Sequence, residues 1–173
     1  MTIVAKVEAL FPTLDRNQYK QLYRDLELKM QQMGHLVPYR EQLNWTQVIE
    51  DRELGDQQTL QQLKTAAAKN DHVFLFYAKW FKKTVYQHLI IHPNEEGFYL
   101  PFRFDEPFYL HVHGRKLWVG SSVRLADELG WLELTMNDYE PNHPVKLYWQ
   151  NFRDVCEKSI TKNSPLLLTK GNG

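Results

Sequence analysis

Aromatic residues are unevenly distributed along this chain, and their distribution constrains the fold more than any other feature. Of the 23 Phe, Trp and Tyr residues, 18 lie between Phe74 and Phe152, whereas ten of the 12 Gln residues lie at or before Gln62. The second part must therefore supply an aromatic core, and the first part is typical of helices with hydrated outer faces. No Gly/Ser linker and no internal repeat separates the two parts, so the sequence predicts a single domain over residues 1–173.

Residues 1–70 are predicted to form a helical N-terminal portion. Asp15 and Gln18 have the spacing of a capping box, and Asp56 is placed to cap a later helix. Gly34 is a natural helix stop. Three helices are therefore expected, over residues 15–34, 39–52 and 56–69.

Residues 71–119 are predicted to form an antiparallel sheet. Short runs of apolar and β-branched residues are separated by turn residues such as those at 94–97 and Gly114. The connections are too short for crossover helices, which favours antiparallel pairing. The expected strands are Val73–Tyr77, Val85–His92, Phe98–Phe104, Phe108–His113 and Lys116–Val119.

Residues 120–163 are predicted to form C-terminal helices. Ser121 and Ser122 follow Gly120 and can cap a helix whose buried face includes Leu129. Pro144 is suited to the first position of a last helix, in which Phe152 and Cys156 lie on the apolar face. A short edge strand is expected at Leu166–Leu168. The fold class is therefore predicted to be α+β, with a sheet of four to six strands packed by helices from both ends of the chain.

Charge and cysteine content limit the possible environments and partners. The 21 Lys and Arg residues balance the 21 Asp and Glu residues, which argues against a nucleic-acid partner held by bulk charge. The basic, aromatic segment Lys79–Lys83 can bind single-stranded nucleic acid in principle, but in a neutral chain it is predicted to be a solvated turn. The single Cys156 fits a reducing compartment, and no apolar run is long enough to cross a bilayer. We therefore expect a soluble cytoplasmic protein with no nucleic-acid and no membrane partner.

Histidines on the predicted strands raise the alternative of a metal site. His111 and His113 lie two residues apart, so on a strand their side chains point to the same face. His88 and His92, with a carboxylate from Glu95, Glu96 or Asp105, could complete a site for zinc or iron. This alternative predicts a small enzyme that depends on a divalent metal such as zinc. The sequence has no HExxH motif, so the preferred expectation is that the protein has no cofactor and no catalytic residues.

A partner-binding surface is the preferred functional interpretation. Large amphipathic side chains of the types enriched at interface hot spots lie on or near the predicted sheet, and Pro101 places their strand near an edge. The candidate residues are Tyr99, Arg103, Tyr109 and Trp118. The competing interpretation is that helices cover both faces of the sheet and these aromatic residues belong to the core.

Three sequence stretches resemble small bacterial cytosolic proteins, some of them related to immunity proteins. The stretches are EGFYLPFRFDEPF, GSSVRLADELGWLE and KSITKNSPLLL. The resemblance assigns no functional residue. Together with the candidate surface, it leads to the expectation of a non-catalytic protein-binding module, of an immunity or regulatory type, whose partner is another protein.

Overall fold

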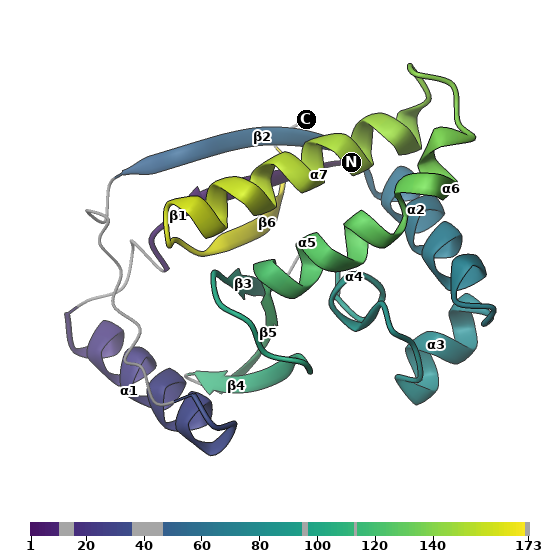
Figure 1. The fold of residues 1–173 in the computed structure, drawn as a ribbon. Coiled ribbons are helices and arrows are strands. Elements are labelled where there is room, and N and C mark those ends of the chain that lie inside the picture. Colours follow the sequence, from purple (N-terminus) through teal and green to yellow (C-terminus); the bar gives the residue numbers. More distant parts are fainter. Residues whose placement is uncertain (11–15, 36–46, 95–96, 113, 172–173) are drawn as a thin grey trace.

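The computed structural model describes residues 1–10, 16–35, 47–94, 97–112 and 114–171 (Figure 1). In these residues, helices pack on a six-stranded, mostly antiparallel sheet, which confirms the predicted α+β class. The strands are β1 (Thr2–Glu8), β2 (Val48–Asp56), β3 (Phe98–Leu100), β4 (Phe108–Val112), β5 (Arg115–Ser121) and β6 (Leu166–Lys170). The helices are α1 (Arg16–Gln32), α2 (Gln57–Asn70), α3 (Leu75–Phe81), α4 (Gln87–Ile90), α5 (Ser122–Trp131), α6 (Glu133–Asn137) and α7 (Pro144–Thr161).

The strand order is β2-β1-β6-β3-β5-β4, so strands from both ends of the sequence meet in the sheet. Strand β1 pairs antiparallel with both β2 and β6. Strand β3 pairs parallel with β5, which differs from the purely antiparallel arrangement predicted. After β3 the chain passes to β4 at the edge of the sheet. The antiparallel β4–β5 hairpin then places β5 between β4 and β3. This choice of neighbour is a long-range effect that the short turns do not encode.

The N-terminal portion is not wholly helical, because it contributes two strands. In β1, the side chains of Ile3, Ala5 and Val7 are buried and alternate with partly exposed ones, which is the period of a half-buried strand. Of the helix predicted over residues 39–52, residues 39–46 lie outside the described part of the chain, and the rest belongs to strand β2. The proposed capping residue Asp15 also lies outside the described residues, whereas the Asp56 cap is confirmed by a hydrogen bond from the Thr59 backbone N–H.

Two segments predicted as strands, residues 73–77 and 85–92, contain helices α3 and α4 instead. Apolar runs this short have no periodicity that separates a strand from a helix. Lys82, with φ of 53°, ends α3 in the left-handed conformation, and the chain turns before α4 begins. Only Ala78 is buried in α3, whereas His88, Leu89 and Ile90 of α4 are buried.

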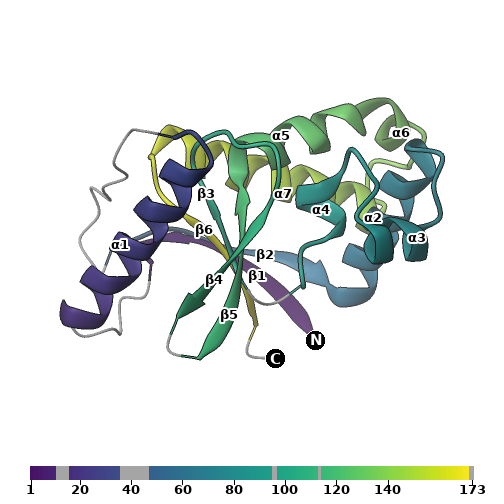
Figure 2. The same cartoon turned by 90° about the horizontal axis from the view of Figure 1, so that it is seen from below.

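The two faces of the sheet carry separate hydrophobic clusters. On one face, residues of α2, α5 and α7 pack against alternate residues of β1, β6, β3 and β5, including Tyr99 and Trp118. On the other face, α1 covers β3, β4 and β5 through residues such as Leu22, Phe98 and Val119 (Figure 2). The fold thus leaves β2 at one edge of the sheet and β4 at the other.

Candidate functional site

An acidic surface occupies the β2 edge of the sheet and the neighbouring side of α7. Strand β2 contains four carboxylates, at Glu50, Asp51, Glu53 and Asp56, against the single cation Arg52. On the adjoining helices, Glu133, Asp154 and Glu157 line one hollow together with Lys146 and Arg153, and Arg153 lies 3.8 Å from Glu133. Asp154 and Glu157 also line a second hollow together with Arg52. We define the acidic surface as Glu50, Asp51, Glu53, Glu133, Asp154 and Glu157.

The edge position of β2 exposes its carboxylates on both sides of the strand. Alternation along the strand directs Glu50 to the α7 face, where Leu54 is buried, and directs Asp51 to the opposite face. Asp51 is 56% exposed and lies 3.7 Å from Lys6 of β1. Glu53 is also exposed, and no ion pair of Glu53 occurs among the described residues. The edge therefore presents negative charge to any molecule that approaches it from the side.

Arg52 holds part of this surface in a fixed arrangement. Its guanidinium donates to Glu50 at 2.9 Å and to Asp154 on α7 at 2.9 Å. Because these groups are partly solvated, the pairs add little to the free energy of unfolding. They instead orient one carboxylate from β2 and one from α7 side by side. The second hollow also contains Lys158 and Lys162, so cationic groups limit the acidic surface at the end of α7.

The backbone of β2 has a feature that fixes the direction of its last residues. The register with β1 shifts between Glu53 and Gly55, which leaves Leu54 as the extra residue of a bulge. Gly55 has φ of +142°, and a Cβ there would lie 2.9 Å from Cδ2 of the buried Tyr148. Asp56 then caps α2, and the Thr59 N–H that it accepts lowers the pKa of its carboxyl group. The acidic strand is thus joined rigidly to a helix.

The four residues predicted to bind a partner do not share one exposed face. Tyr99 and Trp118 are buried, because α5 and α7 cover their side of the sheet and the Tyr99 ring packs against His92 and Phe152. Their placement at the centre of an exposed surface is therefore wrong. Arg103 is exposed and forms a 2.6 Å ion pair with Asp127, and Tyr109 is half-buried beside two lysines. A partner contact by Arg103 or Tyr109 stays a prediction.

The histidines do not assemble the predicted metal site in the described part of the chain. His111 is exposed on β4, His113 lies outside the described residues, and His88 and His92 lie buried in and after α4. The His88 ring accepts a hydrogen bond from Ser121 N–H at Nδ1, and its Nε2 lies 3.1 Å from the Asp105 carbonyl. Burial lowers the pKa of His88 to about 4. No group of three or more His, Cys, Asp or Glu side chains that could hold a metal occurs among the residues that the structure describes.

Two residues with ionisable side chains, Glu128 and Lys64, are buried in the interior. The Glu128 carboxylate accepts the backbone N–H groups of His88 and Leu89 at 3.1 and 2.8 Å, and burial raises its pKa to about 8. Lys64 donates to the His92 carbonyl and to Asn94 Oδ1, both at 2.6 Å, and burial lowers its pKa to about 7. Each group satisfies backbone or amide atoms, and neither faces the acidic surface.

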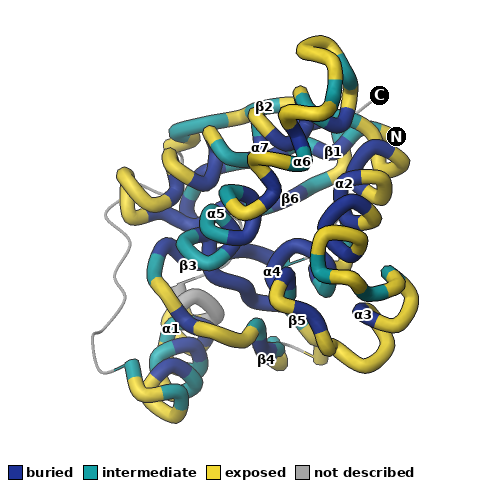
Figure 3. Tube along the Cα trace, turned by 45° about the vertical axis from the view of Figure 1, so that its right-hand side comes forward, coloured by how far each residue is buried: buried dark blue, intermediate teal, exposed yellow. Residues whose placement is uncertain are grey.

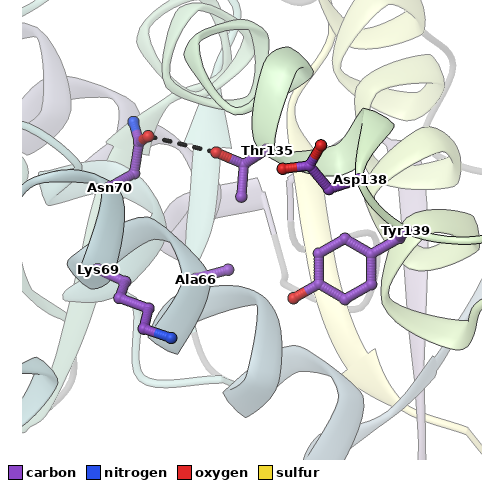
Figure 4. Close-up of a pocket in the computed structure, with 6 residues that line it drawn as sticks. All are labelled: Ala66, Lys69, Asn70, Thr135, Asp138 and Tyr139. Atoms are coloured by element: carbon purple, nitrogen blue, oxygen red, sulfur yellow. Dashed lines mark hydrogen bonds between the residues drawn. The ribbon is translucent and has the colours of Figure 1, made fainter.

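A hollow of about 440 Å³ between α2 and α6 brings together Lys69, Asn70, Thr135, Asp138 and Tyr139 (Figure 4). Thr135 donates to Asn70 across it at 3.2 Å. Its two charged residues, Lys69 and Asp138, are exposed. A catalytic acid or base needs a shifted pKa, which burial normally supplies, so this hollow lacks the setting for acid–base chemistry.

Sequence reasoning did not find the acidic surface, although a signal for it exists. The signal is the presence of four acidic residues among the nine residues of β2. The segment has no alternating apolar pattern that would predict a strand, and its first residues fall at the end of the helix predicted over residues 39–52. Only its pairing with β1 and its position beside α7 reveal that the carboxylates gather on one edge.

Comparison with known protein families gives one match. A family model described as "Putative DNA-mimic protein" matches residues 35–168, which is well over half of the chain and includes β2 and α7. No curated protein and no solved structure matches the chain. In the described residues, no helix has the length and apolar character that spanning a membrane requires.

The family match corrects two functional expectations. The immunity type of module is wrong, and so is the alternative of a metal-dependent enzyme, because the matched family is described by mimicry of DNA. The broader expectation of a non-catalytic protein that binds another protein is compatible with this family. The expectation of an unidentified protein partner with nucleic acid excluded is corrected as well, since a DNA mimic is directed at proteins that bind DNA. That the partner is a protein agrees with the family. By this match the chain belongs to the family described as "Putative DNA-mimic protein".

Proposed function

We propose that this protein binds a DNA-binding protein and that the acidic surface occupies the place of DNA phosphates. The observation that carries the proposal is the clustering of carboxylates on β2 and α7, within the segment that the family model matches. A protein that binds DNA relies largely on Lys and Arg contacts to phosphates, so a fixed row of carboxylates is complementary to the same side chains.

The spacing along β2 supports this role. Alternate residues of a strand lie about 6.7 Å apart, so the spacing of Asp51 and Glu53 corresponds to roughly two nucleotides of one DNA strand, whose charges follow one another every 3.4 Å along the helix axis. The net charge of the whole chain is zero, so attraction of a basic partner depends on this local cluster and not on bulk charge. The binding is therefore expected to weaken as salt concentration rises.

The location of the protein follows from the same proposal. A partner that binds DNA is found inside the cell, and the buried free thiol of Cys156 is compatible with a reducing compartment. We therefore propose a cytoplasmic location.

A displacement experiment tests the proposed function. DNA-binding proteins from a lysate of the source cells are retained on immobilised duplex DNA, and the purified protein is then added to release its partner. We expect one or a few proteins to be released, and mass spectrometry identifies them. The released protein, once purified, should bind the chain and duplex DNA competitively.

Charge variants make this experiment specific to the acidic surface. The double variant Asp51→Asn, Glu53→Gln removes two charges of the row and should weaken binding to the purified partner by tenfold or more at low salt. Glu27→Gln is the matched control, because it removes a carboxylate from α1, outside the matched segment. The proposal is wrong if no protein is displaced, or if the double variant displaces the partner as well as the unchanged protein does.

A further inference from the structure

The short helix α3 presents an exposed aromatic surface that the proposed function does not use. Phe76 is 74% exposed and Trp80 is 71% exposed, while Ala78 is the only buried residue of the helix. Phe74, Tyr77 and Phe81 are exposed around them, and the helix projects from the body of the molecule (Figure 3). Exposed apolar patches of this kind mark interaction sites in proteins that are otherwise well packed.

The exposed rings form two pairs along the helix, one stacked and one tilted. The ring centroids of Phe76 and Trp80 lie 5.8 Å apart with an interplanar angle of 30°. The Tyr77 and Phe81 centroids lie 4.6 Å apart at 39°. Both pairs have the four-residue spacing that aligns side chains on one face of a helix. The surface thus offers ring faces to a further planar group.

Lysines extend this surface from α3 to the β4–β5 hairpin. Lys79 and Lys83 lie on and after α3, and the Lys82 ammonium lies 5.7 Å from the ring centroid of Tyr109 on β4. Lys116 on β5 approaches the same ring to 4.1 Å. Lys82, which follows the exposed Trp80 by two residues, thus lies with Lys116 at the two sides of a path that crosses the Tyr109 ring. The Lys79 ammonium donates to Gln61 Oε1 on α2 at 3.1 Å. The neighbouring carboxylate of Asp71 accepts the Val85 N–H, and Glu106 lines a small hollow beside Lys82.

We infer that this path, which we call the basic aromatic surface (Phe76, Lys79, Trp80, Lys82, Lys83, Tyr109 and Lys116), binds single-stranded nucleic acid. Unpaired bases stack on exposed aromatic rings, and their phosphates pair with lysines, which is the chemistry that this surface provides. Duplex DNA keeps its bases stacked inside and leaves the rings unused. A second copy of the same surface is a poorer occupant, because it would bring the lysines of the two copies together.

The inference is independent of the proposed function and concerns a different side of the molecule. Strand β2 and helix α7 lie at the top of Figure 1, whereas α3 and β4 lie toward the bottom. A polynucleotide bound along α3 is therefore not in contact with the carboxylates of the acidic surface. The basic segment at residues 79–83, predicted from the sequence to be a solvated turn, belongs in this account to a binding surface.

Fluorescence anisotropy with a labelled 20-nucleotide oligothymidylate tests the inference. The full chain should bind this probe at low salt, and unlabelled oligouridylate should compete while duplex DNA competes far less. Trp80→Ala should weaken binding by about tenfold or more, because it removes a stacking platform. Trp131→Ala is the control, since Trp131 is an exposed tryptophan of α5 that packs against Tyr86 and Arg124 and is not a member of the basic aromatic surface. This variant should bind the probe as the unchanged protein does.

The salt dependence of binding separates the lysine contacts from the stacking contacts. Lys82→Gln and Lys116→Gln should each lower the slope of log affinity against log salt by about 0.7, the value expected for one phosphate of a single strand. Unfolding curves confirm that each variant is folded. Because α3 contributes almost nothing to the core, its variants should unfold like the unchanged protein.

Three outcomes would overturn the inference. The first is no binding of either oligonucleotide at low salt, and binding to phosphatidylglycerol vesicles in that case would assign the basic aromatic surface to a lipid headgroup layer. The second is binding that Trp80→Ala leaves unchanged. The third is equal binding of polyglutamate, which has charge but no bases.

Discussion

The acidic surface and the basic aromatic surface are supported in opposite ways by the fold. The acidic side chains stand on β2 and α7, which are tied to the core through Leu54, Tyr148 and Phe152. The basic aromatic side chains stand on α3, which buries only Ala78, and on one edge of the sheet. One surface consists of carboxylates on a rigid base, and the other combines aromatic rings and lysines, most of them on or next to a lightly packed helix.

This difference shows which feature of each surface requires an explanation. Carboxylates at the surface are ordinary, and only their clustering and fixed geometry point to a function. Exposed Phe and Trp rings forgo the free energy that burial would give, so their exposure itself points to a function. Substitutions of buried residues beneath each surface and of the exposed residues themselves test this contrast, because only the former should change the free energy of unfolding.

The largest effect is expected in the core beneath the acidic surface. Phe152→Ala and Leu129→Ala should each lower the free energy of unfolding by about 2–5 kcal/mol, because both side chains are fully buried. Urea unfolding measures this change. A loss well below 1 kcal/mol at both positions would show that α5 and α7 are not the rigid base described above.

A smaller effect is expected at the β2 bulge. Gly55→Ala should cost about 1–3 kcal/mol, because alanine at φ of +142° is strained and its Cβ meets the ring of Tyr148. Gly130→Ala is the matched control on α5, where nothing lies within 4 Å of the added Cβ, and alanine there should stabilise the helix by about 0.5–1 kcal/mol. Equal thermal unfolding of the two variants would contradict the account of the bulge.

The pH dependence of the free energy of unfolding should reveal the buried amine of Lys64 on α2. Burial lowers its pKa from 10.5 to about 7, so between these values the unfolded chain binds a proton that the folded chain does not. The contribution of this residue to stability is therefore present at high pH and is lost as the pH falls toward 7. Lys64→Met should remove that part of the rise in stability between pH 7 and 10.5. Parallel curves for the variant and the unchanged protein over this range would show that the amine is not desolvated.

The smallest effect on stability is expected on α3 itself. Trp80→Ala should change the free energy of unfolding by no more than about 0.5 kcal/mol, because the side chain is largely exposed. The same denaturation experiment measures it beside Phe152→Ala. A loss above 2 kcal/mol would mean that the aromatic rings of α3 serve packing and not binding.

Local signals in the sequence were sufficient for the elements whose pattern is long or capped. Pro144 and the apolar face through Phe152 predicted α7, Ser121 predicted the start of α5, and Asp56 predicted the start of α2. Each of these signals acts within one helix, so the surrounding fold does not change it. The α+β class followed from the same signals.

Features that depend on distant partners were not accessible in the same way. Strand β2 is polar along most of its length, and it is a strand because β1 supplies its hydrogen bonds. Glu128 is buried because α4, forty residues earlier in the chain, directs two backbone N–H groups at it. The aromatic segment at residues 73–81 became a helix although its composition favours a strand. The acidic surface combines two such segments, so no single stretch of sequence contains it.

The position of β1 has a consequence for the synthesis of the chain on the ribosome. Ile3 of β1 is paired with Lys170 of β6, so β1 cannot form all its strand pairings until β6 has been synthesised. Contacts between residues so far apart slow folding, because the intervening chain must be ordered before the pair can form. Until β6 is released, one side of the β1–β2 pair has free hydrogen-bonding groups, which invite association with other chains. The edge of β1 that pairs with β6 is therefore the part of the nascent sheet most exposed to association during synthesis.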